Sequence, residues 1–233
     1  MTERKSSEKI ISLHLVALSI VLILGGINRL APWFRSPFLG CEFFLVRDVI
    51  SIFGITPLIA LILWNLNYIL QPANRIAQAI FLFFIVIFSV SMGAHDVTNT
   101  LGMARDIVPL KVFMTMDFVD NKLTHDTFFA SFAGMTVVLL IGQVGNPLEK
   151  PMSVSSLVFA LASAAMVGLV IFANMAFEKT GVDIIVGLSI QVIGILLWLK
   201  KRKSILCLPI VMFFLVSFSL GFIGASLFKL ISR

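Results

Sequence analysis

The sequence predicts an all-α integral membrane protein, a single bundle of about seven transmembrane helices, with six as the alternative count. Composition is the first reason: 59% of its 233 residues are hydrophobic and only 13% are charged, against about 25% in ordinary soluble domains. The second reason is that the apolar residues form runs long enough to cross a bilayer, which takes about 20 residues. No polar stretch is long enough for a separate soluble domain, so we expect one polytopic transmembrane domain over residues 1–233.

The apolar runs are predicted to be helices and not strands. Backbone groups in lipid must find their hydrogen bonds within the protein, which leaves helices and closed barrels as spanning structures. Barrel strands alternate apolar and polar residues, whereas these runs are continuously apolar. The expected spans, in chain order, cover residues 10–28, 49–70, 76–95 with a polar extension to 103, 127–144, 152–177, 184–199 and 204–230.

The basic residues predict how the chain is oriented. The run 10–28 is long for the core of a signal peptide and no small-residue cleavage site follows it, so we expect an uncleaved first span. Lys and Arg are equally numerous on the two sides, but the run 200–203 concentrates four of them in one turn. Such a turn resists translocation, which predicts a cytoplasmic N-terminus and an external C-terminus. The expected location is the bacterial inner (cell) membrane.

Small residues and prolines predict local features of the bundle. Ala160, Ala164 and Gly168 repeat every four residues, a spacing that lets helices approach closely within a chain or between chains. Homo- or hetero-oligomers through such helix faces are therefore one expectation. Pro57 and Pro209 lie inside predicted spans and are expected to kink them.

Acidic and histidine residues are unevenly distributed between the two sides. Most of the 12 Asp and Glu residues, together with His95 and His125, fall on the side opposite the N-terminus, here called the far side. His95 lies at the end of the third span beside Asp96, and ionisable residues at such a place are functional candidates by default. If residues 117–126 are helical, His125 and Asp117 share a face, because residues at multiples of four lie above one another.

A third polar patch lies between the fifth and sixth spans. Asn174 and Glu178 share a helical face at the end of the fifth span, and Asp183 opens the sixth. A carboxylate at that point suits the positive end of a helix. The same residues could equally serve only as helix caps or as partners of nearby Arg and Lys residues.

Two histidines and a carboxylate form a common ligand set for Zn²⁺ or Fe²⁺. The candidate metal ligands are His95, His125 and Asp96, with Asp120 or Glu178 as alternatives for the third. A remaining carboxylate could act as general base on a metal-bound water, so Asp96, Asp120 and Glu178 are the candidate catalytic residues. No HExxH or HxxxH motif supports the set. Cu(I) is a weaker alternative, suggested by four nearby methionines, Met92, Met103, Met114 and Met116.

Three functions remain open from the sequence, so whether the chain is an enzyme is undecided. The first is a metal-dependent membrane enzyme acting on a lipid or another amphipathic substrate at the non-cytoplasmic surface. The second is a transporter or channel for a small or lipidic solute, for which the mid-span residues His14, Asn65, Asn67 and Gln191 are candidates. The third is a non-catalytic assembly subunit. The expected partner is membrane lipid and not nucleic acid, because the net charge of +6 comes from residues that flank spans.

Overall fold

The computed structural model describes residues 2–102, 107–177 and 181–231. Within these ranges it contains seven helices that are long and apolar enough to cross a membrane, which confirms the predicted fold class and span count. Large apolar side chains on the outer surface, such as Leu13, Val90 and Leu169, are about two-thirds exposed. A water-soluble protein rarely leaves that much apolar surface uncovered, whereas a bilayer covers it.

Five spans are single helices and two are composite. The single helices are α1 (Thr2–Leu30), α4 (Arg75–Gly102), α7 (Val154–Phe177), α8 (Val182–Lys201) and α9 (Pro209–Ile231). Each composite span contains a π-helical segment: α2 (Val46–Ile50), the segment Ser51–Ile55 and α3 (Thr56–Leu70) form one, and α5 (Leu110–Phe118), the segment Val119–Thr124 and α6 (His125–Gly145) form the other. Short 3-10 turns occupy Pro32–Arg35 and Ile205–Cys207, and strands β1 (Pro37–Phe38) and β2 (Cys41–Leu45) form a small antiparallel hairpin.

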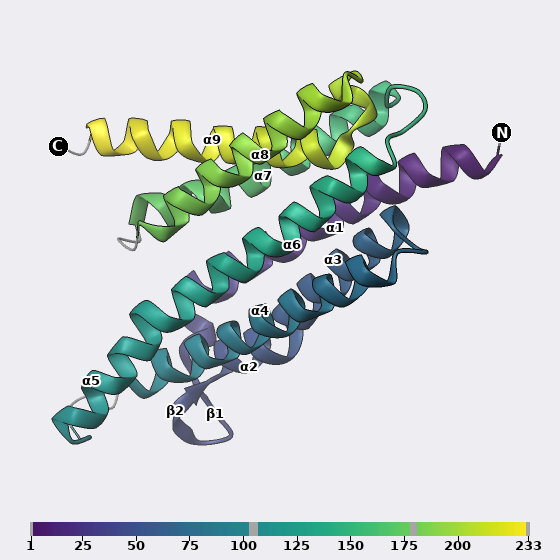
Figure 1. Ribbon diagram of the computed structural model, residues 1–233. Helices are drawn as coiled ribbons and strands as arrows, with labels where there is room; N and C mark the ends of the chain where they lie inside the picture. The colour runs from purple at the N-terminus through teal and green to yellow at the C-terminus, as the bar shows by residue number, and fades with distance from the viewer. Residues whose placement is uncertain (1, 103–106, 178–180, 232–233) are drawn as a thin grey trace.

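Helix α6 lies between two groups of helices. Figure 1 shows α3 and α4 on one side of it and α7, α8 and α9 on the other, with α1 behind it. The most extensive helix–helix contact is between α7 and α9, and α1 packs on α7. The termini lie at opposite ends of the bundle, as an odd number of spans requires. The hairpin and α5 lie at the far-side end (Figure 1).

Close helix packing depends on small residues where the backbones approach. A Cβ atom on Gly134 of α6 would come within 2.4 Å of the Phe84 ring of α4, so only glycine fits there. The predicted small-residue stripe on α7 behaves in the same way: Ala160 and Ala164 are fully buried, and Gly168 lies against Leu220 of α9. Because lipid supplies no hydrophobic drive between helices, such close contacts stabilise the bundle by van der Waals packing.

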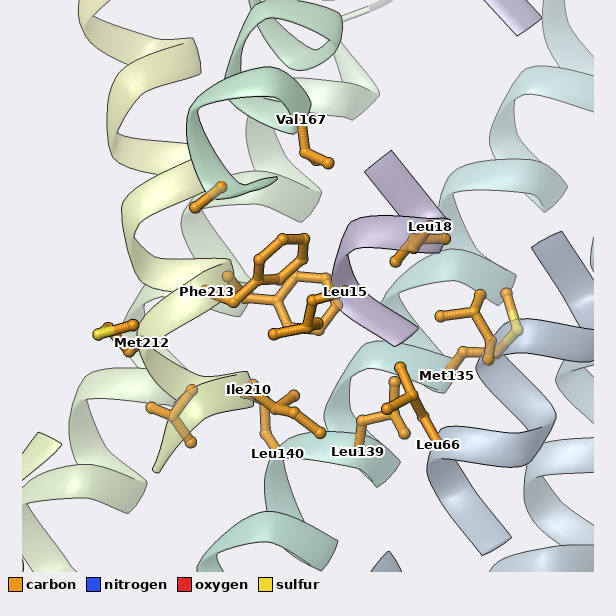
Figure 2. Packing of buried hydrophobic residues seen from close by; sticks show 14 of the residues in the cluster. Leu15, Leu18, Leu66, Met135, Leu139, Leu140, Val167, Ile210, Met212 and Phe213 are labelled. Atoms are coloured by element: carbon orange, nitrogen blue, oxygen red, sulfur yellow. The ribbon is translucent and has the colours of Figure 1, made fainter. Parts of the chain in front are cut away.

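Apolar side chains from several spans fill the centre. Leu15 of α1, Leu140 of α6 and Phe213 of α9 are all fully buried, and Figure 2 shows them gathered where these helices meet. At the end of the bundle nearer the N-terminus, amide side chains tie the turns together. Gln71 donates from Nε2 to Asn67 and to the backbone oxygen of Val138, at 3.1 and 3.2 Å. This end of the bundle is therefore cross-linked through polar groups that would otherwise be buried without partners.

One local prediction was wrong, one element was not predicted, and one span is longer than predicted. Pro209 does not kink a helix but is the first residue of α9, where its missing N–H and fixed φ are tolerated. The hairpin was not predicted. The fourth span was expected to start at residue 127, yet helix runs without a break from Leu110, because the π segment joins α5 to α6. Pro57 follows the π segment Ser51–Ile55, so the expected irregularity of that span is a widened turn.

Candidate functional site

Both π segments pack against α4 near its far-side end. Ser51, from the first segment, donates its hydroxyl to Asp96 of α4. Asp120, from the second segment, lies with its Oδ1 2.9 Å from Nδ1 of His95. Single π turns are rare and occur frequently at functional sites. The widened turns thus bring side chains from two other spans to the adjacent pair His95 and Asp96.

His95 is buried between an arginine and a carboxylate. Arg29, near the end of α1, donates from a terminal guanidinium nitrogen to Nε2 of His95 at 2.7 Å. Since arginine only donates, Nε2 accepts, and the neutral ring then carries its proton on Nδ1. The Nδ1 position meets Asp120 at the distance of an ion pair but without the alignment of a hydrogen bond. Thr98 also donates to Oδ1 of Asp120, at 3.1 Å, which fixes that carboxylate.

The second histidine lies against the first. The ring centroids of His95 and His125 are 4.9 Å apart and the rings are nearly perpendicular, at 84°. His125 is the first residue of α6, one position after the π segment, so the same widened turn sets its direction. The predicted pairing of these two histidines across α4 and α6 is therefore present in the fold.

Two buried carboxylates, Asp48 and Asp96, are held by hydroxyl, backbone and guanidinium donors. Asp48 of α2 accepts from the hydroxyl of Thr100 at 2.6 Å and from the backbone N–H of Leu45 at 3.0 Å. Arg47 adds a contact from Nε at 3.3 Å. Asp96 receives the Ser51 hydroxyl. Asp48, which sequence reasoning did not select, fastens the hairpin and α2 to α4.

Metal binding by the predicted ligands is not shown by the described part of the chain. Among the residues that the structure describes, no set of three or more His, Cys, Asp and Glu side chains could hold an ion. His95 and His125 meet edge to face, and both nitrogens of His95 already face Arg29 or Asp120. The metal centre stays a prediction, as does a role for Glu178, which lies outside the described residues.

A cavity of about 330 Å³ opens beside these residues, and all seven spans line it. We call it the main cavity. Its polar end is formed where the spans reach the far side, and its apolar body extends toward the middle of the bundle. The polar end includes Asn28, Arg29, Arg47, Asp48, Ser51, His95, Asp96, His125, Asn174 and Asp183. The body includes Leu18, Leu22, Ile59, Phe88, Phe128, Phe132, Val167, Val170, Ile171 and Phe218.

A second cavity, of about 310 Å³, lies between α4 and α5. Asp117 and Asp120 line it together with Thr98 and Asn99. Asp120 therefore faces this second cavity while its carboxylate touches His95, which lines the main cavity. The Asp120–His95 contact is thus a polar link between the two cavities.

The mid-span polar residues proposed for transport have partners inside the chain. His14 contacts the carbonyl oxygen of Ile10, one turn earlier in its own helix, at 2.8 Å. Gln191 donates to the carbonyl oxygen of Leu215 at 2.9 Å, which ties α8 to α9. Asn67 belongs to the amide network around Gln71, and Asn65 is exposed on the outer surface. These contacts describe packing roles for three of the four candidates.

Sequence reasoning found the two histidines, Asp96 and Asp120 but missed the residues that position them. Arg29 was counted only as a flanking basic residue, and Ser51 was not considered. A signal for both residues was present in the sequence. Arg29 and Ser51 are polar residues at or just inside the far-side ends of apolar runs, the same ends that carry the histidines. Comparison of the chain with protein-family models, with curated protein sequences and with solved structures finds no significant match. The geometry of the chain itself is therefore the basis for assigning its function.

Proposed function

We propose that this multi-pass membrane protein is an enzyme that holds an amphipathic substrate in the main cavity and exchanges protons with its headgroup through His95. The observation that carries the proposal is the form of that cavity. Its apolar body lies within the spans, and its polar end holds a histidine contacted by Arg29 on one nitrogen and Asp120 on the other. The proposed working surface is the non-cytoplasmic one.

The cavity has the size and lining of a ligand site. Its volume falls within the range of about 300–1,000 Å³ typical of small-molecule sites, which combine apolar walls with a few polar groups. Aromatic rings of Phe88, Phe128 and Phe132 suit a hydrocarbon chain. A headgroup at the polar end would lie at the level where the spans leave the membrane, which is the arrangement that a lipid adopts in the bilayer.

The histidine has the contacts that proton transfer needs. Imidazole changes charge near neutral pH and is the commonest general acid or base. Because Arg29 donates to Nε2, the neutral ring carries its proton on Nδ1, where the Asp120 carboxylate lies 2.9 Å away. In the proposed step the headgroup displaces Arg29 from Nε2 and gives its proton to that nitrogen, and the Nδ1 proton passes to Asp120, which also lines the second cavity. Until then, Arg29 holds the ring in place from the opposite nitrogen.

Occupancy of the cavity is tested by filling it. Val170 of α7 lines the main cavity, whereas its neighbour Leu169 is 65% exposed on the lipid-facing surface. Val170→Trp therefore places an indole ring inside the main cavity, and Leu169→Trp places the same ring on the lipid-facing surface. Purified in a mild detergent and analysed by native mass spectrometry, wild type and Leu169→Trp should retain a bound amphiphile and Val170→Trp should lose it. Equal occupancy in all three proteins would contradict the proposal.

Catalysis is tested separately from binding. His95→Gln keeps a polar side chain of similar length but cannot exchange protons near neutral pH, and His14→Gln is the matched control in α1. The two variants are expressed in host cells and the membrane lipids are profiled. We expect one amphiphile, the unconverted substrate, to accumulate with His95→Gln and not with His14→Gln. If both variants match wild type while Val170→Trp still loses its ligand, the chain binds the amphiphile without converting it.

A further inference from the structure

The polar end of the main cavity has spare hydrogen-bond acceptors. Asp183 is 97% buried as α8 begins, its relative exposure being 3%, and its Oδ1 accepts from the backbone N–H of Ile184 at 2.8 Å. Its other oxygen, Oδ2, is buried and has no hydrogen-bond partner among the described residues. Asn28 of α1 is also buried, and its Nδ2 donates to the carbonyl oxygen of Arg47 while its Oδ1 has no partner there. Both residues line the cavity.

Several donors at or near this end already have partners inside the chain. The Ser51 hydroxyl donates to Asp96, and the Thr100 hydroxyl donates to Asp48. Arg29 donates to His95, and Arg47 contacts Asp48 through Nε. Native proteins satisfy nearly all buried polar atoms, so unpartnered acceptors in a cavity indicate a ligand that supplies donors.

The charges at the polar end point the same way. The carboxylates of Asp48, Asp96 and Asp183 line the cavity, against the guanidinium groups of Arg29 and Arg47. An anionic phosphate would lie among these carboxylates and would be repelled by them. A hydroxyl group carries no charge for the carboxylates to repel, and an ammonium group is attracted by them.

We infer that the headgroup bound at the polar end donates hydrogen bonds to Asp183 and Asn28, so that the ligand is a lipid bearing hydroxyl or ammonium groups and not a phosphate. The inference rests on the proposed function, since it assigns the headgroup of the amphiphile placed in the main cavity. It names Asp183, at the start of α8, as a residue that sets specificity.

The test compares headgroups on one dodecyl chain. Dodecylamine and monododecanoylglycerol donate hydrogen bonds; dodecyltrimethylammonium carries the charge without a donor; dodecyl phosphate is the anion. Ethanolamine and glycerol serve as chainless probes. Affinities are measured by microscale thermophoresis on protein stripped of lipid, for wild type, Asp183→Asn and Asp126→Asn. The last variant is the matched control, because Asp126 pairs with Lys122 at the surface and does not line the cavity.

We expect dodecylamine or monododecanoylglycerol to bind best, and Asp183→Asn to weaken that binding about tenfold or more, as loss of a hydrogen bond to a charged group does. Asp126→Asn should bind as wild type does. Because the Asn side chain retains Oδ1, it can still accept from Ile184 and preserve the helix start. A larger loss for dodecylamine than for the glycerol ester identifies ammonium as the natural headgroup.

Different failures have different meanings. Tightest binding of dodecyl phosphate, or equal binding of dodecylamine and dodecyltrimethylammonium, would overturn the headgroup assignment and leave the amphiphile cavity in place. Equal binding of ethanolamine or glycerol without a chain would overturn the assignment to a lipid. If no probe binds and Val170→Trp changes nothing, the proposed function itself fails.

Discussion

Among the carboxylates near the site, we expect Asp48 to be the one whose removal destabilises the protein most. It is 3% exposed and accepts from Thr100, from the backbone of Leu45 and from Arg47. The substitution Asp48→Ala leaves a buried N–H and a partly buried guanidinium without their partner. Removing one member of a buried ion pair destabilises a protein by about 3–5 kcal/mol. At about 2–4 °C per kcal/mol for a chain of this length, the expected fall in Tm is about 6–20 °C.

The assay is thermal unfolding of purified protein in one detergent, followed by a probe of tertiary structure. Asp126→Ala is the control, because the Lys122–Asp126 pair is exposed, with side-chain exposures of 67% and 41%. Exposed pairs contribute about 0–1 kcal/mol, so its Tm should fall by no more than about 4 °C. If the two variants unfold within about 2 °C of each other, Asp48 does not anchor the hairpin and α2 to α4 as described.

Three further predictions concern metal content and packing. If His95 and His125 bind the metal predicted from the sequence, the double variant His95→Ala, His125→Ala should lose about one equivalent of zinc, iron or copper by plasma mass spectrometry; equal metal content in the variant and wild type would refute the metal centre. Gly221→Val should lower the Tm, since a Cβ there would lie 2.4 Å from Ile171, and overpacking destabilises by about 1–3 kcal/mol. Gly93→Ala, with open space around it, should not; similar falls in both would contradict the packing argument. Gln71→Leu should destabilise by about 1–3 kcal/mol, because it leaves buried partners without hydrogen bonds, and an unchanged Tm would refute this.

The sequence was sufficient for the fold class because lipid imposes a simple rule on the chain. Apolar runs of fixed length must be helices, so seven runs predict seven spans. It was less informative about where helices begin, since residues 110–126 are polar enough to resemble a loop yet continue α6 outward as helix. Pro209 illustrates the same limit, because proline is compatible with both a kink and a helix start.

The candidate site was only partly predictable for a physical reason. His95 and Asp96 are conspicuous as ionisable residues at the end of an apolar helix, and helical spacing relates each to its own neighbours. Which side chains from other spans reach them depends on the rotation of those helices. The π segments set that rotation, and no residue pattern in 51–55 or 119–124 predicted a widened turn. Arg29 and Ser51 could therefore not be assigned to His95 and Asp96 in advance.

The widened turns also divide each composite span into two parts that can be adjusted separately. An α-helix advances about 100° per residue, so one extra residue in a turn rotates everything beyond it by that angle while the rest of the helix keeps its register. Deleting a single residue from 51–55 would thus turn Asp48 away from α4 and leave the lipid-facing surface of α3 unchanged. Insertions of this kind allow the chemistry of a site to be re-aimed without redesigning the membrane-spanning surface that carries it.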